Sequence, residues 1–187
     1  MRVFWYLGLC VGAVIIAAGL FSTLPTCHPA PPKDSGAQRT CYAIESAVNN
    51  FHVEYGMLPV DLTADPTVPL NTKTDIEFLN VLLGLTENRK PPLNTRAIKF
   101  LNVKEGKNGK NGLIYSAAGT TVTGLVDPWG GAYYVMLDGN NDDTIKVKPV
   151  AAKAETTLRD RKVAVWSNGA DCVNGVGGKI GDDVKTW

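Results

Sequence analysis

A large excess of charge of either sign is missing from this chain. Its 187 residues include 19 lysines and arginines and 18 aspartates and glutamates, for a formal net charge of +1. Nucleic-acid-binding proteins owe much of their affinity to positive charge facing the phosphate backbone. The sequence therefore predicts no nucleic-acid partner.

Groups that commonly carry catalysis are also scarce. The chain has two histidines, His28 and His52, and neither stands in a cluster of cysteines or carboxylates. Ser116 and Ser167 lack the glycine-flanked context of an activated serine nucleophile. These absences predict a protein that is not an enzyme and has no small-molecule substrate.

Cysteine is rare as well, with four in the chain. Cys10 lies in an N-terminal apolar run, which leaves Cys27, Cys41 and Cys172 in the remainder. A disulfide can form outside the cytosol, but three thiols cannot all pair within one chain. The sequence does not choose the pair.

No acidic residue occurs before Asp34, and no charged residue occurs from Val3 to Phe21. At about 1.5 Å per residue, this run covers most of a ~30 Å hydrocarbon core, so residues 1–22 are predicted to be a transmembrane anchor. The first charged residue after Arg2 is Lys33, which predicts a cytoplasmic N-terminus and an exported C-terminal domain. A cleaved signal peptide and, less well supported, a lipoprotein signal ending at Cys27 are the alternatives.

The remaining chain divides into a short linker and one domain. Residues 23–34 contain four prolines and are predicted to be a linker, which leaves residues 35–187 as the domain. Asp34 or Ser35 can cap a helix that ends near Gly56, and its apolar residues recur at spacings of three and four. These are Ala37, Cys41, Ile44, Val48, Phe51 and Tyr55. A second, shorter helix is predicted over residues 75–85, and residues 58–74 are predicted to be a loop.

From Ala97 onward the pattern changes to short extended segments separated by turns. Strands are predicted at 113–115, 133–137, 144–150 and 162–166. The domain is therefore predicted to be α+β, with an amphipathic helix packed on a small antiparallel β-sheet.

The segment from Asp138 to Asp143 has the composition of a hairpin turn between two of these strands. Asp138, Asn140 and Asp142 also alternate like the start of an EF-hand loop, but Asp143 replaces the glycine at position six and Pro149 replaces the glutamate at position twelve. We predict a hairpin turn, with a second weak ion site as the alternative.

The C-terminal segment combines glycines with aspartates. Asp171, Asp182 and Asp183 are accompanied by Gly175, Gly177, Gly178 and Gly181. Carboxylates on a chain that can double back suit Ca²⁺, which accepts several oxygen ligands in loose geometry. The alternative is an ordinary flexible ending whose aspartates are solvated.

Three fragments in this order resemble the major pseudopilins of bacterial type II secretion systems, relatives of the type IV pilins. They are the helix running from Ile44 to Tyr55 and on to Gly56 and Pro59, the turn Asp127-Pro128-Trp129-Gly130 with Tyr133, and the ending from Ser167 to Trp187.

The resemblance implies a pilin-like fold and a structural subunit of the secretion apparatus with no enzymatic activity. It implies a single-pass protein of the bacterial inner membrane, with its domain in the periplasm and with other pseudopilins, inner-membrane secretion components and further copies of itself as partners. It also implies a calcium ion bound by Asp171, Asp182 and Asp183, with oxygens around Ser167 completing the shell.

Two departures from the family are plain. The apolar N-terminal segment lacks the family's glutamate, and prolines interrupt what should be a long helix. Cleavage by prepilin peptidase, N-terminal methylation and filament packing are therefore open. The alternative function is a membrane-tethered, exported calcium-binding module that has a pilin-like fold and does not polymerise.

Overall fold

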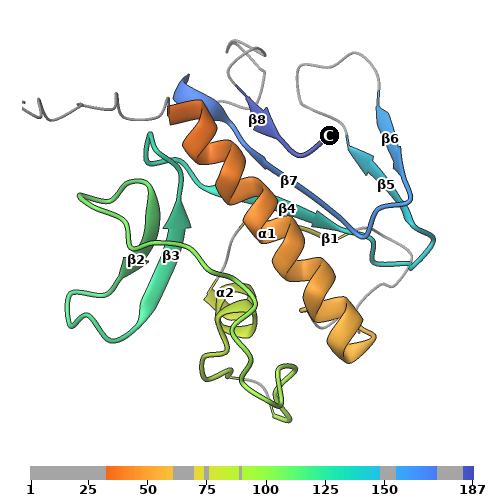
Figure 1. Ribbon diagram of the computed structural model, residues 1–187, viewed down its shortest axis with the longest axis horizontal. Helices are drawn as coiled ribbons and strands as arrows, with labels where there is room; N and C mark the ends of the chain where they lie inside the picture. Colours follow the sequence, from red (N-terminus) through yellow and green to blue (C-terminus); the bar gives the residue numbers. More distant parts are fainter. Residues whose placement is uncertain (1–32, 61–69, 74–75, 89, 148–154, 172–182) are drawn as a thin grey trace, which may run out of the picture. The chain divides into compact units, whose positions relative to one another are not determined.

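The structure is a computed structural model that describes residues 33–60, 70–73, 76–88, 90–147, 155–171 and 183–187 (Figure 1). The predicted anchor over residues 1–22 lies outside these ranges, as does most of the predicted linker. Among the described residues, no helix combines the length and the apolar character needed to cross a membrane.

The described elements follow one another as two helices and eight short strands, with one turn of 3₁₀-helix. They are α1 (Lys33–Tyr55), β1 (Leu70–Lys73), α2 (Ile76–Leu83), β2 (Gly112–Tyr115), β3 (Val122–Val126), β4 (Tyr133–Leu137), β5 (Thr144–Val147), β6 (Thr156–Arg159), β7 (Val163–Ser167), η1 (Gly169–Asp171) and β8 (Val184–Lys185).

The strands form three antiparallel sheets. The largest has the order β1-β4-β7-β8, and the pairs β2-β3 and β5-β6 form two smaller sheets. The predicted α+β class is confirmed at this level.

Helix α1 lies against β7 and β8 (Figure 1), and its apolar residues belong to the main core cluster. Every member of the predicted stripe up to Phe51 is fully buried, and Tyr55 is partly buried. The helix ends as predicted at Gly56, which has a left-handed φ of 67° and donates its N–H to the His52 carbonyl at 2.8 Å. The periodicity of α1 therefore identified the face that covers the sheet.

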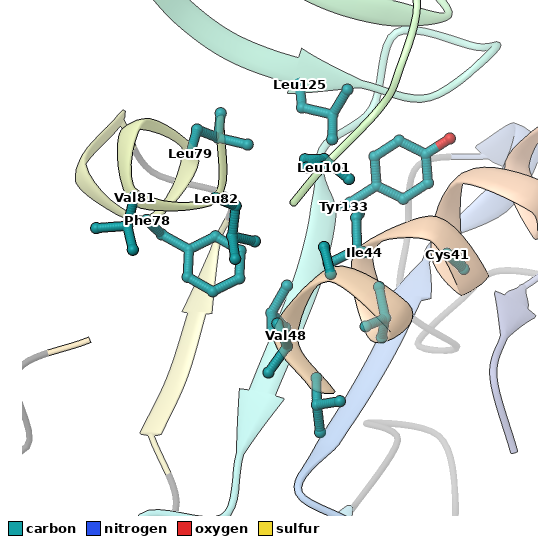
Figure 2. Packing of buried hydrophobic residues seen from close by; sticks show 14 of the residues in the cluster. Cys41, Ile44, Val48, Phe78, Leu79, Val81, Leu82, Leu101, Leu125 and Tyr133 are labelled. Atoms are coloured by element: carbon teal, nitrogen blue, oxygen red, sulfur yellow. The ribbon is translucent and has the colours of Figure 1, made fainter. Parts of the chain in front are cut away.

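Helix α2 completes the core beside α1 (Figure 2). Its side chains Phe78, Leu79 and Leu82 are buried with Leu101 and Leu125, and the same cluster contains Ile44 and Val48 of α1. The predicted helix over residues 75–85 is thus confirmed, with slightly narrower bounds.

Three local predictions were wrong. Asp34 and Ser35 lie within α1 instead of capping it. Residues 70–73, predicted as part of a loop, form β1 at the edge of the large sheet, where main-chain pairing with β4 suffices without an alternating pattern. The segment 138–143 is not a hairpin turn, because β4 pairs with β1 and β7 whereas β5 pairs with β6.

The other face of the large sheet carries aromatic side chains. Trp166 stacks on Tyr134 with ring centroids 5.4 Å apart and meets Trp187 edge-on at 5.9 Å. Beside them, Ile145, Val147 and Leu158 of the β5-β6 sheet form a small second core with Ala164.

Candidate functional site

The carboxylate of Asp127 organises the turn between β3 and β4. Asp127 is only 1% exposed, and its Oδ1 accepts hydrogen bonds from the backbone N–H groups of Trp129, Gly130 and Gly131 at 2.9, 2.8 and 2.7 Å. A buried charge is tolerated when it is fully hydrogen-bonded, and three amides at one oxygen meet that need. The predicted Asp-Pro turn is confirmed, and its aspartate is its centre.

Glycine is required at two positions of this turn. A Cβ atom on Gly131 would lie 2.8 Å from Oδ2 of Asp127, too close for any side chain. Gly130 adopts a φ of 104°, which disfavours residues with a Cβ. The paired glycines after the tryptophan therefore let the carboxylate reach the amides.

The second carboxylate oxygen of Asp127 links the turn to the end of β7. Ser167 is fully buried and donates its hydroxyl to Oδ2 of Asp127 at 2.6 Å, while its Oγ accepts the N–H of Gly169 at 3.2 Å. One serine thus joins the Asp127 turn to the first residue of η1, where the C-terminal segment begins.

Strand β8 returns the end of the chain to the same place. Val184 is the register partner of Ser167, and Thr186 donates its N–H to the Val165 carbonyl at 3.1 Å. Gln38 of α1 donates its Nε2–H to the Lys185 carbonyl at 2.9 Å. Both ends of the C-terminal segment are therefore fastened at β7, beside the N-terminal half of α1.

The structure places three of the four predicted metal residues at this junction. Ser167 ends β7, Asp171 ends η1, and Asp183 directly precedes Val184 in β8. Asp182 lies outside the described residues. The antiparallel pairing of β7 with β8 brings Asp183 next to the residues that follow Ser167. Calcium binding by these four residues stays a prediction.

Asn168 adds a group that the sequence did not single out. This side chain is 7% exposed, and its Oδ1 is buried without a hydrogen-bond donor among the residues that the structure describes. Such an acceptor costs free energy unless a donor or a cation satisfies it. Amide oxygens are regular Ca²⁺ ligands, so Asn168 fits the donor set expected between Asp171 and Asp183.

A second buried aspartate lies at the opposite end of β4. Asp138 is fully buried, and its carboxylate accepts the N–H groups of Asp142 and Asp143 at 3.1 and 2.9 Å. Lys162 completes the group, with Nζ 3.3 Å from Asp138 Oδ2 and 2.7 Å from Asp143 Oδ1.

Two backbone amides and the Lys162 ammonium group thus bind the Asp138 carboxylate, which the alternative ion site would have used as a ligand. Within the described ranges no three histidine, cysteine, aspartate or glutamate side chains gather as a metal group. The segment 138–143 therefore has the contacts of a structural turn that directs β5 out of the large sheet.

Two ionisable side chains of α1, Cys41 and Glu45, have raised pKa values. Burial raises the pKa of Glu45, and Arg161, whose guanidinium lies 2.7 Å away, partly opposes this. Burial raises the pKa of Cys41 to about 12, and the nearby Asp127 and Glu45 carboxylates add to the effect. Cys41 carries a free thiol in the core, and at neutral pH that thiol stays protonated and a poor nucleophile.

The comparisons with known proteins supply no relative to guide the assignment. No protein-family model, no curated protein and no solved structure matches this chain.

Proposed function

We propose that this protein is a membrane-anchored structural subunit of the pseudopilin kind, exported and stabilised by calcium, in a type II secretion or type IV pilus-like apparatus. Residues 1–22 anchor it in the bacterial inner membrane, and the domain stands in the periplasm. Its partners are other pseudopilins, inner-membrane secretion components and further copies of itself. It carries no catalytic activity.

One observation carries this proposal. A long helix lies on an antiparallel sheet whose last strand returns to β7, so that both ends of the Asp- and Gly-rich segment meet beside Ser167. The resemblance to pseudopilins implies a calcium ion in the loop after the last main strand, and here that loop is the segment that leaves β7. The orphaned Asn168 oxygen at this junction adds an independent reason to expect a cation.

Calcium removal tests the proposal directly. The chain from residue 31 onward is a compact unit with its own core and suits a melting experiment. A calcium concentration of a hundred times the dissociation constant stabilises the folded state by about 2.7 kcal/mol. For a domain of this size, that raises the melting temperature by roughly 5–10 °C relative to chelator.

Matched variants locate the ion. Asp171→Asn, Asp182→Asn and Asp183→Asn should each remove most of the calcium response, and Asn168→Ala should reduce it. Asp142→Asn is the control, because it removes a carboxylate from the 138–143 turn and should leave the response intact. Equal melting temperatures in calcium and chelator would refute calcium binding, and a response lost only in Asp142→Asn would move it to the other turn.

The alternative is a tethered calcium-binding module that does not polymerise. The apolar segment without glutamate and the prolines before α1 favour it. Cross-linking in membranes separates the two functions. Ladders of the protein with itself and with secretion components support the subunit, whereas a calcium-responsive protein that is cross-linked to neither supports the module.

A further inference from the structure

Asparagine is followed by glycine at four positions of this chain, which are Asn108, Asn111, Asn168 and Asn174. Such pairs can lose the side-chain amide spontaneously, because glycine has no side chain to shield its backbone nitrogen. That nitrogen loses its proton and attacks the asparagine Cγ atom. The Cγ–Nδ2 bond then breaks, ammonia leaves with the proton, and a cyclic succinimide remains. Water opens this ring to aspartate or isoaspartate. Asn174 lies outside the described residues, so the structure distinguishes the other three.

The fold shields the pair Asn168-Gly169 by burial and by a hydrogen bond. Asn168 is 7% exposed, and Gly169 is buried at the start of η1. The nitrogen that would have to attack belongs to Gly169, and its N–H donates to Ser167 Oγ at 3.2 Å. Succinimide formation at Asn168 therefore requires the junction of β7 and η1 to open first.

The pair Asn111-Gly112 is shielded by its strand. Asn111 donates its backbone N–H to the Asp127 carbonyl at 2.7 Å, and Gly112 is buried in β2 opposite Val126. A Cβ atom on Gly112 would lie 2.3 Å from the carbonyl oxygen of Lys104, so the backbone is closely surrounded here. Rotation of this backbone to bring the Gly112 nitrogen onto the Asn111 side chain requires β2 to separate from β3.

Asn108 and Gly109, in contrast, form an exposed two-residue turn. Their φ values are 53° and 69°, and a Cβ atom built on Gly109 would meet no other part of the described chain within 4 Å. Two backbone hydrogen bonds between Lys107 and Lys110, at 2.9 and 3.1 Å, close the turn. Water therefore reaches both the Asn108 side chain and the nitrogen that would attack it.

The charges around this turn make it easy to open. Lys107 and Lys110 are direct cross-strand partners with exposed side chains, and like charges at such positions destabilise a strand pair. Below the turn, Gly106 donates its N–H to the Leu113 carbonyl at 2.8 Å. Opening can therefore stay confined to the exposed tip, which costs little free energy. The two ammonium groups also favour the ionised form of the Gly109 nitrogen, which is the form that attacks.

We propose that Asn108 is a site of spontaneous covalent modification, where succinimide formation converts the asparagine to aspartate and isoaspartate, while the fold protects Asn111 and Asn168. The net reaction consumes one water and releases one ammonia. The product removes one unit of positive charge from a formal total of +1 and sets a carboxylate between two lysines in the sequence. Isoaspartate also adds a methylene group to the backbone of a two-residue turn, so the pairing of Lys107 with Lys110 should be lost in that product.

Incubation of the full chain in detergent and mildly alkaline buffer tests this assignment. Peptide mass spectrometry with fragmentation gives the conversion rate at each asparagine, and Asn174 is scored separately. In the folded protein Asn108 should convert more than about tenfold faster than Asn111 or Asn168, whose reactions wait for paired strands to open. In guanidinium chloride this lead should be largely lost, because the unfolded chain shields none of the three.

Variants test the contribution of the two lysines. Lys107→Gln/Lys110→Gln should slow the conversion of Asn108 about two- to fivefold, as the removal of a like-charge pair predicts. The control Lys90→Gln/Lys146→Gln removes the same charge elsewhere and should leave the rate unchanged. No conversion at Asn108 would overturn the site. Equal rates at the three asparagines in the folded protein, or a lead of Asn108 that persists in denaturant, would overturn protection by the fold.

Discussion

The turns at the two ends of β4 both bury an aspartate, but they complete its hydrogen bonding differently. Asp127, before the strand, accepts three backbone amides and a neutral serine hydroxyl from the end of β7. Asp138, after the strand, accepts two amides and the ammonium group of Lys162, next to the start of β7. Each turn therefore fixes one end of the β4-β7 pair.

Because of this difference, the stability of each end of the β4-β7 pair should depend on different side chains. The Asp138 turn depends on a counter-charge, so the protonation of Lys162 affects its contribution to stability. The Asp127 turn depends on backbone amides and on Ser167, which couples it to the C-terminal segment where calcium is proposed. Removal of one group at a time should separate these two dependencies.

The largest effect is expected for Asp127→Ala. This change leaves three part-buried turn amides and the buried Ser167 hydroxyl without their acceptor, and an unsatisfied buried group costs about 1–3 kcal/mol. Because water can enter part of the space, we expect a total loss of about 3–5 kcal/mol in the free energy of unfolding, measured by urea denaturation.

Asp127→Asn is the matched control. It keeps an oxygen where the three amides converge, but it removes the charge and replaces Oδ2, the acceptor of the Ser167 hydroxyl, with an NH₂ donor. Because the three amides keep their acceptor, its loss should be smaller than that of Asp127→Ala. Equal losses in the two variants would contradict the role of the amide bonds and leave the charge and the bond to Ser167 as the important properties of Asp127.

A smaller loss, about 2–4 kcal/mol, is expected for Lys162→Met. The substitution keeps much of the side-chain volume but leaves the fully buried Asp138 without a counter-charge, which is costly even though two amides remain. Asp138→Asn in the Lys162→Met background should recover part of the loss, as a double-mutant cycle measures.

The pH dependence of this pair has a definite sign. The hydrogen bond to Asp143, together with Asp138, raises the pKa of Lys162 above its usual 10.5. The stabilisation is therefore complete below pH 10.5 and is lost as pH rises through the higher value in the folded state. The stability difference between wild type and Lys162→Met should shrink over that window, and a constant difference would contradict an ionic contribution.

The sequence predicted those parts of the fold that follow from local periodicity. The spacing of Ile44, Val48 and Phe51 identified the buried face of α1, because a helix that covers a sheet needs one apolar stripe. The short apolar run 133–137 before a turn-rich segment and the β-branched residues near Val163 and Val165 likewise identified β4 and β7. Strand partners were not predictable in this way, since pairing joins residues far apart in the chain.

The candidate site was predictable only in part for the same reason. Asp171 and Asp183 were chosen for the Asp- and Gly-rich composition and the family resemblance, whereas only the pairing of β7 with β8 shows that Asp183 lies beside the residues that follow Ser167. The bond from Ser167 to Asp127 spans 40 residues and had no local signal. The sequence contained one clue to the buried carboxylate, because Gly130 and Gly131 follow Asp127 by three and four residues.

The smallest effect, about 1–2 kcal/mol, is expected for Ser167→Ala, which removes one donor to Asp127 and the acceptor of the Gly169 N–H. The same variant tests which function the serine hydroxyl has. If the hydroxyl only links the turn to η1, the loss should be equal in calcium and in chelator, because the ion then binds both proteins alike. If the hydroxyl is a calcium ligand, the loss should be larger in calcium. The predicted calcium set includes Ser167, but its hydroxyl already donates to Asp127 and accepts from Gly169, so we expect the structural outcome. Thermal unfolding of wild type, Ser167→Ala and Asp171→Asn under both conditions distinguishes the two, and Ser167 keeps its place in the calcium set only if Ser167→Ala loses its calcium response as Asp171→Asn does.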